Sequence, residues 1–90
     1  MIAKGKTKGS IKFSIRPAAG VKQVQLAGDF NAWKPAGMKK QKDGSFSLAL
    51  DVPDGHQEYK YIVDGMWVVD PDNSHWALNA YGTLNSVVEI

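Results

Sequence analysis

The chain has 90 residues, no cysteine and a net charge of +2, so it is expected to form one small domain without disulfides, zinc-thiolate sites or cysteine nucleophiles. Hydrophobic residues make up 43% and charged residues 22%, which is ordinary globular usage and argues against a disordered or fibrous chain. No apolar run approaches the ~20 residues of a membrane span and no signal-peptide pattern is present, so we expect a cytoplasmic protein without membrane contact.

Charge is unevenly distributed along the chain. Residues 1–22 contain six basic side chains and no acidic one, whereas residues 23–90 contain five basic and nine acidic side chains. Residues 1–9 have lysines, glycines and little to bury, so we expect a flexible basic tail. Residues 10–90 are then expected to form a single folded domain.

Apolar and polar residues alternate over most of this predicted domain, which is typical of half-buried strands. The pattern predicts strands over residues 10–16, 23–26, 45–52, 57–63 and 66–69. A short extended piece over 38–42 and a last strand over 84–90 are also expected. Turns rich in proline, glycine and aspartate separate these strands. Residues 29–37 and 75–82 are predicted to be loops, the second with at most one helical turn.

Six or seven short strands, with turn signals about every 8–12 residues, predict an all-β fold. The expected architecture is an immunoglobulin-like β-sandwich of antiparallel strands, and a small barrel is the alternative. Phe13 and Phe46 fall on the apolar side of their strands and are expected in the core. In the strand over 57–63, Tyr59 and Tyr61 share one face, and Lys60 lies on the opposite face.

The sequence offers no catalytic site. His56 and His75 are flanked by polar turn residues, and their spacing from nearby aspartates matches no metal-binding pattern. Asp29, Asp64 and Asp70 adjoin turn residues, where an aspartate typically bonds the local backbone. We therefore expect no enzymatic activity, no metal and no cofactor.

Two tryptophans stand apart from the apolar runs. Trp33 is in a predicted loop beside Asn31 and Lys34, and Trp67 closely follows a hairpin. A tryptophan with polar neighbours suits a ligand that is apolar on one face and polar at its rim, as a sugar ring is. Composition alone leaves open the alternative that both tryptophans fill gaps in the core.

Four motifs occur in order: Gly28-Asp-Phe-Asn-Ala-Trp33, Tyr59-Lys-Tyr-Ile-Val-Asp-Gly-Met-Trp67, Asp70-Pro71 and Gly82-Thr-Leu-Asn85. Together they resemble carbohydrate-binding module family 48 over residues 10–90. This family includes the glycogen-binding domain of the AMP-activated protein kinase β subunit and the N-terminal domains of isoamylases and branching enzymes. The resemblance implies an early-set immunoglobulin-like sandwich that binds α-1,4-glucans such as glycogen, starch or cyclodextrin.

The resemblance also implies which residues bind the sugar. Trp33 and Trp67 would be stacking platforms for consecutive glucose rings. Lys60 would donate hydrogen bonds to sugar hydroxyls, and Thr83 and Asn85 would provide hydroxyl and amide contacts at the rim.

Two aromatic residues depart from the family pattern. Tyr81 stands where the family carries a leucine that projects against the sugar, so it either adds stacking area or narrows the site. Trp76 has no counterpart, and we expect it to plug the space under the 70–82 loop, a third platform being the alternative. Phe30 is expected in the core, and Asn31 is expected to form the turn that directs Trp33.

The favoured function is therefore a non-catalytic α-glucan-binding module. The alternative is a protein docking module of the same fold that binds no sugar, its partner being a glycogen-metabolism enzyme or a kinase. Nucleic-acid binding is disfavoured, because residues 23–90 carry a net charge of −4 (five bases against nine acids) that repels phosphate.

Overall fold

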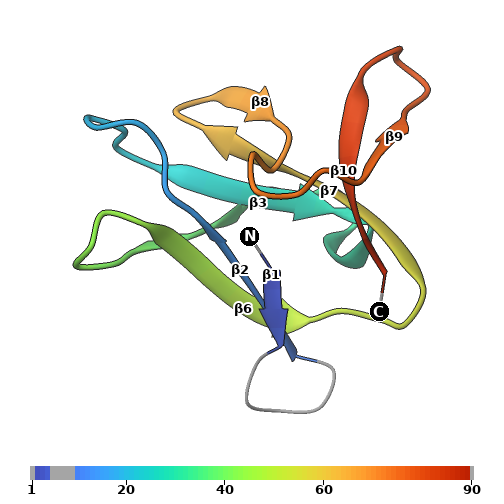
Figure 1. Ribbon diagram of the computed structural model, residues 1–90, viewed down its shortest axis with the longest axis horizontal. Helices are drawn as coiled ribbons and strands as arrows, with labels where there is room; N and C mark the ends of the chain where they lie inside the picture. The colour runs from blue at the N-terminus through green and yellow to red at the C-terminus, as the bar shows by residue number, and fades with distance from the viewer. Residues whose placement is uncertain (1, 5–9, 90) are drawn as a thin grey trace.

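The computed structural model describes residues 2–4 and 10–89, which form two antiparallel sheets packed as layers (Figure 1). The elements are β1 (Ile2–Lys4), β2 (Ser10–Ile15), β3 (Val24–Gly28), the 3-10 helix η1 (Asp29–Asn31), β4 (Ala36–Gly37), β5 (Lys39–Lys40), β6 (Phe46–Asp51), β7 (His56–Val63), β8 (Met66–Val68), β9 (Trp76–Leu78) and β10 (Leu84–Glu89). One sheet has the strand order β1-β2-β6-β5, and we call it the first sheet. The second sheet has the order β4-β3-β7-β10-β9, with β8 paired to β7. This arrangement confirms the predicted all-β sandwich over the alternative barrel.

The core lies between the two sheets, because each contributes the apolar side of its alternating strands. Phe13 of β2 and Tyr59 of β7 are fully buried, with ring centroids 5.1 Å apart in an edge-to-face contact. Phe46 is buried as predicted, and Phe30 is partly buried with its ring centroid 5.2 Å from that of Phe13. Strand β7 therefore turns its tyrosines into the sandwich, and its alternate residues face outward.

A buried polar network ties the second sheet to the segment after β8. Asp70 is fully buried, and its carboxylate accepts hydrogen bonds from the Tyr59 hydroxyl at 2.8 Å and the Asp72 backbone N–H at 3.0 Å. The Asp70 N–H donates to the Ser86 hydroxyl at 2.7 Å. Burial, with the Asp70 charge beside it, raises the pKa of Tyr59, which keeps this hydroxyl protonated as a donor. Asp70 thus does more than the local turn bonding that its sequence neighbours predicted.

The structure differs from the sequence predictions at the N-terminal end of the chain. The predicted flexible tail does not hold for residues 2–4, which form β1 and pair antiparallel with β2, with Ile2 packed against the core. Residues 1 and 5–9 of that predicted tail lie outside the described residues, as does residue 90. The sequence pattern missed β1 because a three-residue edge strand shows too little alternation to be recognised.

The predicted loop over 75–82 contains β9, which pairs with β10 in the register Leu78 with Leu84 and Trp76 with Ser86. The expectation that Trp76 plugs this loop is wrong, because its side chain is 55% exposed. Strand β9 is the edge of its sheet and projects with part of β10 beyond the rest of the sandwich (Figure 1). In the described part of the chain, no helix is long and apolar enough to cross a membrane.

Candidate functional site

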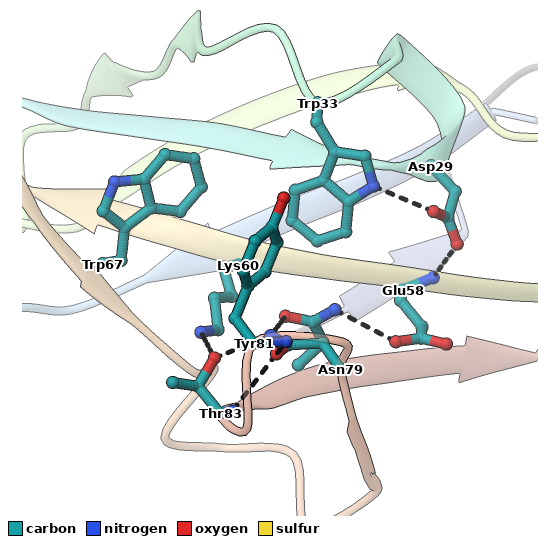
Figure 2. A pocket seen from close by; sticks show the side chains of 9 residues that line it. Asp29, Trp33, Glu58, Lys60, Trp67, Asn79, Tyr81 and Thr83 are labelled. Atoms are coloured by element: carbon teal, nitrogen blue, oxygen red, sulfur yellow. Dashed lines mark hydrogen bonds between the residues drawn. The ribbon is translucent and has the colours of Figure 1, made fainter.

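The outer face of the second sheet carries an open pocket of about 560 Å³ (Figure 2). It is lined by Asp29, Trp33, Glu58, Lys60, Trp67, Asn79, Tyr81, Thr83 and Asn85. These side chains come from five places: the turn at η1, β7, β8, the β9–β10 turn and β10. The structure thus brings together all six candidate residues of the sequence analysis, from segments up to 52 positions apart in the numbering (33 to 85).

Three aromatic side chains surround the pocket. Trp67 of β8 is 50% exposed, and Tyr81, in the β9–β10 turn, is 92% exposed. Trp33 is partly buried. In the view of Figure 2, the Tyr81 ring stands between the two indole rings. Neither tryptophan fills the core, so the alternative that sequence composition left open does not hold.

The turn around η1 sets the position of Trp33. Gly28 is needed there, because a Cβ atom would come within 2.7 Å of the Glu58 backbone oxygen and of the Phe30 ring. The Asn31 side chain closes the turn by accepting from the Gly28 N–H at 2.9 Å and donating to the Leu26 oxygen at 3.3 Å. The Trp33 N–H then donates to the Gly28 oxygen at 2.9 Å, with Trp33 in the left-handed region at φ 61°. This agrees with the expected role of Asn31 as a turn former.

Asp29 holds Trp33 from the side. One carboxylate oxygen accepts from the Trp33 indole N–H at 2.9 Å, and the other accepts from the Glu58 backbone N–H at 2.8 Å. The sequence predicted only local bonding for Asp29, but this carboxylate joins the indole to β7, 29 positions away. The orientation of the indole plane is therefore tied to the sheet.

The polar wall of the pocket is a continuous set of hydrogen bonds (Figure 2). Lys60 Nζ donates to Thr83 Oγ1 at 3.2 Å, and Asn79 Nδ2 donates to the same oxygen at 2.7 Å. Asn79 Nδ2 also donates to Asn85 Oδ1 at 3.1 Å, and Asn85 Nδ2 donates to Glu58 Oε1 at 3.0 Å. Asn85 is only 6% exposed, so it forms the floor of the pocket, whereas Thr83 is at the rim.

Hydrogen-bond capacity shows which groups remain available to a ligand. Asn79 uses both amide hydrogens on Thr83 and Asn85, and its oxygen accepts from the backbone N–H groups of Tyr81 and Thr83, so it holds the wall together. An ammonium carries three donors and a hydroxyl carries one, so Lys60 and Thr83 keep donors in excess of their mutual bond. One amide hydrogen of Asn85 is used on Glu58, and an amide carries two, so the second can reach a ligand.

Sequence reasoning missed three of the lining residues: Asp29, Glu58 and Asn79. Glu58 shares the outward face of β7 with Lys60, so the alternation that placed Lys60 could have placed Glu58 as well. The segment from Asn79 to Gly82 has the composition of a turn, with Gly82 at φ 79°, and this signal could have identified Asn79 as its anchor. Nothing local in the sequence connects Asp29 to the pocket.

His56 lies next to the pocket between two carboxylates. Its Nε2 is 3.1 Å from Glu58 Oε2, and its Nδ1 is 3.1 Å from Glu89 Oε1. These hydrogen bonds raise the pKa of His56 above its ordinary value of about 6.5, and the bond with Glu58 makes the larger contribution. The polar turn residues that flank His56 in the sequence did not indicate these contacts, which it makes as the first residue of β7. No grouping of histidine, aspartate and glutamate in the described ranges could hold a metal ion.

A family model described as the glycogen recognition site of AMP-activated protein kinase matches residues 11–90. The chain belongs to this glycogen-recognition family. The match extends over most of the chain and confirms the resemblance to carbohydrate-binding module family 48.

Individual relatives agree with this family assignment. The chain is 33% identical to the pig 5'-AMP-activated protein kinase subunit beta-1 over 75 residues, which are 83% of this chain and 60% of that protein. It is 34% identical to the mouse subunit beta-2 over 76 residues, which are 84% of this chain and 28% of that protein. The chain therefore spans at most about three-fifths of the length of these relatives.

A solved structure supports the fold. The crystal structure of a maltogenic amylase from S. marinus aligns with a TM-score of 0.77 at 22% identity, covering 90% of this chain and 13% of that one. This likeness confirms the predicted immunoglobulin-like sandwich. A fold of this kind does not by itself define a function, which depends on the residues that line the pocket.

Proposed function

We propose that this protein is a non-catalytic module that binds α-1,4-glucans in the pocket on the outer face of the second sheet. The observation that carries the proposal is the pairing of two indoles, the half-exposed one of Trp67 and the partly buried one of Trp33, with a polar wall of fixed geometry. A glucose ring presents an apolar face to an aromatic ring and hydroxyls at its edge, and this pocket offers both kinds of surface. Membership of the glycogen-recognition family supports the same substrate class.

Each group then has a role. Trp33 and Trp67 stack against the faces of neighbouring glucose rings, and Tyr81 enlarges the aromatic surface between them. Lys60, Thr83 and Asn85 donate hydrogen bonds to the hydroxyl groups. A shallow site of this size is expected to bind with an affinity between about millimolar and micromolar. On a polymer with many repeated sites, avidity raises the effective affinity of the protein that contains the module.

The carboxylates of the pocket support a binding role over catalysis. Glycoside hydrolysis needs one carboxyl group as an acid and a second as a nucleophile or base. In this pocket both oxygens of Asp29 accept hydrogen bonds from Trp33 and the β7 backbone. Both oxygens of Glu58 are likewise engaged, with Asn85 and His56. These two carboxylates position other groups, so we assign them no catalytic step.

The direct test is a titration of the protein with maltoheptaose, followed by tryptophan fluorescence. A saturable change with a dissociation constant between about 1 μM and 1 mM is expected, because stacking changes the environment of Trp33 and Trp67. A β-1,4-linked glucan of similar length is the control, since its ring faces follow a different path, and it should bind at least about tenfold more weakly. No change with maltoheptaose up to millimolar concentration, in a protein shown to be folded, would refute the proposal.

Protein docking is a second candidate function. Trp76, Leu78 and Leu84 form an exposed apolar strip on β9 and β10, outside the residues that line the pocket. Such a strip is typical of a contact surface. The relatives are named as kinase subunits, so a kinase or a glycogen-metabolism enzyme is the proposed partner. Failure of the sugar titration would make docking the preferred function.

Asp29→Ala is expected to weaken glucan binding about five- to tenfold, because the Trp33 indole loses the acceptor that fixes its plane. Asp29→Asn keeps one acceptor and should fall between Asp29→Ala and the wild type. Isothermal titration with maltoheptaose measures both variants. Asp54→Ala is the matched control, since Asp54 is an exposed turn residue away from the pocket lining. Equal affinities for Asp29→Ala and Asp54→Ala would show that the indole needs no side-chain anchor.

A further inference from the structure

The polar wall of the pocket continues into the ionisable cluster at the start of β7. Glu58 is the link, because Oε1 accepts from Asn85 Nδ2 at 3.0 Å while Oε2 lies 3.1 Å from His56 Nε2. The other nitrogen of His56 lies 3.1 Å from Glu89 Oε1 on β10. A change of charge on His56 therefore acts on the same carboxylate that contacts the pocket floor.

Glu58 determines which way the Asn85 amide points. In the observed orientation, Nδ2 faces the Glu58 carboxylate and Oδ1 faces the Asn79 amide nitrogen. Rotating the amide by half a turn would set its oxygen against the carboxylate and its nitrogen against the Asn79 N–H groups. Both new contacts would be repulsive, because a carboxylate only accepts and an amide nitrogen only donates. The carboxylate thus keeps the Asn85 N–H groups on the side where the pocket needs them.

We propose that Glu58 is a positioning residue for the glucan site and that His56, held between Glu58 and Glu89, makes glucan binding stronger in mildly acidic than in mildly alkaline solution. This inference rests on the proposed function, because it concerns the affinity of the same pocket. It adds a regulatory input that the stacking residues alone do not provide.

The charge states explain the direction of the effect. Protonated imidazole has two N–H donors, one for each carboxylate, so it holds Glu58 in place. Neutral imidazole has one donor and one lone pair, so one of the two carboxylates loses its bond and faces a lone pair. When Glu58 is the one released, Asn85 loses a fixed acceptor and the pocket floor loosens.

The surroundings of His56 favour its charged form. Glu58 faces it from its own strand and Glu89 faces it from β10, and both are acidic. Hydrogen bonds with Glu58 and Glu89 raise the pKa of His56. Both bonds are therefore present below about pH 6.5, and one of them is lost as the pH rises through the raised pKa of His56.

The experiment is a maltoheptaose titration by calorimetry at about pH 6 and about pH 8.5, two conditions on either side of the histidine range. The affinity of the wild-type protein is expected to fall about three- to tenfold between them, which is the effect of one weakened hydrogen bond at the site. His56→Gln should show equal affinities at the two pH values, because it cannot titrate. His75→Gln should keep the wild-type fall, since His75 is exposed and is not among the residues lining the pocket.

Variants of Glu58 separate positioning from general damage. Glu58→Leu should weaken binding at both pH values by about tenfold, because Asn85 loses its acceptor. Glu58→Gln retains an acceptor for Asn85 and should restore most of the affinity. Its affinity should not fall between about pH 6 and about pH 8.5 as that of the wild type does, since the charge that holds His56 is gone. In sugar-free protein, the side-chain amide NMR signal of Asn85 should follow the titration of the His56 ring and should stop doing so in His56→Gln.

The outcomes distinguish this inference from the proposed function. Equal wild-type affinities at the two pH values, or a fall that persists in His56→Gln, would overturn the pH-dependent positioning and leave glucan binding intact. Absence of wild-type binding at both pH values would overturn the proposed function and this inference together. An unfolding midpoint in urea, measured for each variant, shows that the lost affinity is not loss of fold.

Discussion

Replacement of Trp67 by alanine is expected to lower glucan affinity by about 30-fold or more while leaving the protein folded. The indole is half exposed on β8, so truncation removes little core contact. A stacked indole contributes a large contact area, and its loss from a small binding site corresponds to about 2 kcal/mol or more. Calorimetric titration with maltoheptaose measures the loss, because it does not depend on the fluorescence of the residue that is removed.

Trp33→Ala should have a similar effect on affinity and a larger effect on stability. Trp33 is partly buried and its indole N–H is bonded to Asp29, so its removal also disturbs the turn that η1 begins. Trp76→Ala is the matched control, because Trp76 is 55% exposed yet does not line the pocket. Its affinity should stay within about twofold of the wild type. A loss of glucan affinity in Trp76→Ala as large as that in Trp67→Ala would indicate that the sugar binds at β9 instead.

Much of this architecture follows from local rules. Alternation of apolar and polar residues located β2, β6 and β7, since a strand buried on one face must repeat with a period of two. Turn residues such as Asp64-Gly65 placed the hairpin between β7 and β8, because glycine adopts the positive φ that this turn requires. The four motifs then gave five candidate residues and the departure from the family pattern at Tyr81 gave a sixth, and all six lie around one pocket. Their role in binding remains a proposal.

What the sequence could not predict depends on contacts between distant positions. Asp29 and Glu58 are 29 positions apart, and His56 and Glu89 are 33 apart. Each is an ordinary polar residue beside a turn or strand end, and only the sheet pairing brings them together. Strand β9 was missed for a related reason: three residues carry too little pattern, and its pairing with β10 decides its conformation.

The two faces of β7 have different roles, one in the pocket and the other in the core. Lys60 and Glu58 face the pocket, whereas Tyr59 and Tyr61 face the core, where the Tyr59 hydroxyl is bonded to Asp70. The pocket wall therefore rests on a strand that is fixed from behind by a buried polar network. This arrangement agrees with a site whose side chains are pre-positioned before a ligand arrives.

Asp70→Ala tests that support, and it is expected to destabilise the protein by about 3 kcal/mol. The substitution leaves the Tyr59 hydroxyl and the Asp72 N–H without their carboxylate acceptor at a fully buried position. For a domain of this size the unfolding midpoint should fall by roughly 12–24 °C. Urea unfolding, followed by tryptophan fluorescence at neutral pH, gives the free energy of unfolding.

Two further variants show whether the loss of stability in Asp70→Ala comes from the buried polar network. Asp70→Asn keeps an acceptor for one partner and should lose about half as much stability as Asp70→Ala. Asp51→Ala, an exposed aspartate at the end of β6, should change stability by less than about 0.5 kcal/mol. If Asp70→Ala lowered the free energy of unfolding no more than Asp51→Ala does, the network would be dispensable and packing of the tyrosine rings alone would fix β7. If it lowered the free energy of unfolding by the expected amount, the Asp70-Pro71 motif would have a structural role, supporting the strand behind the pocket without contact with the sugar.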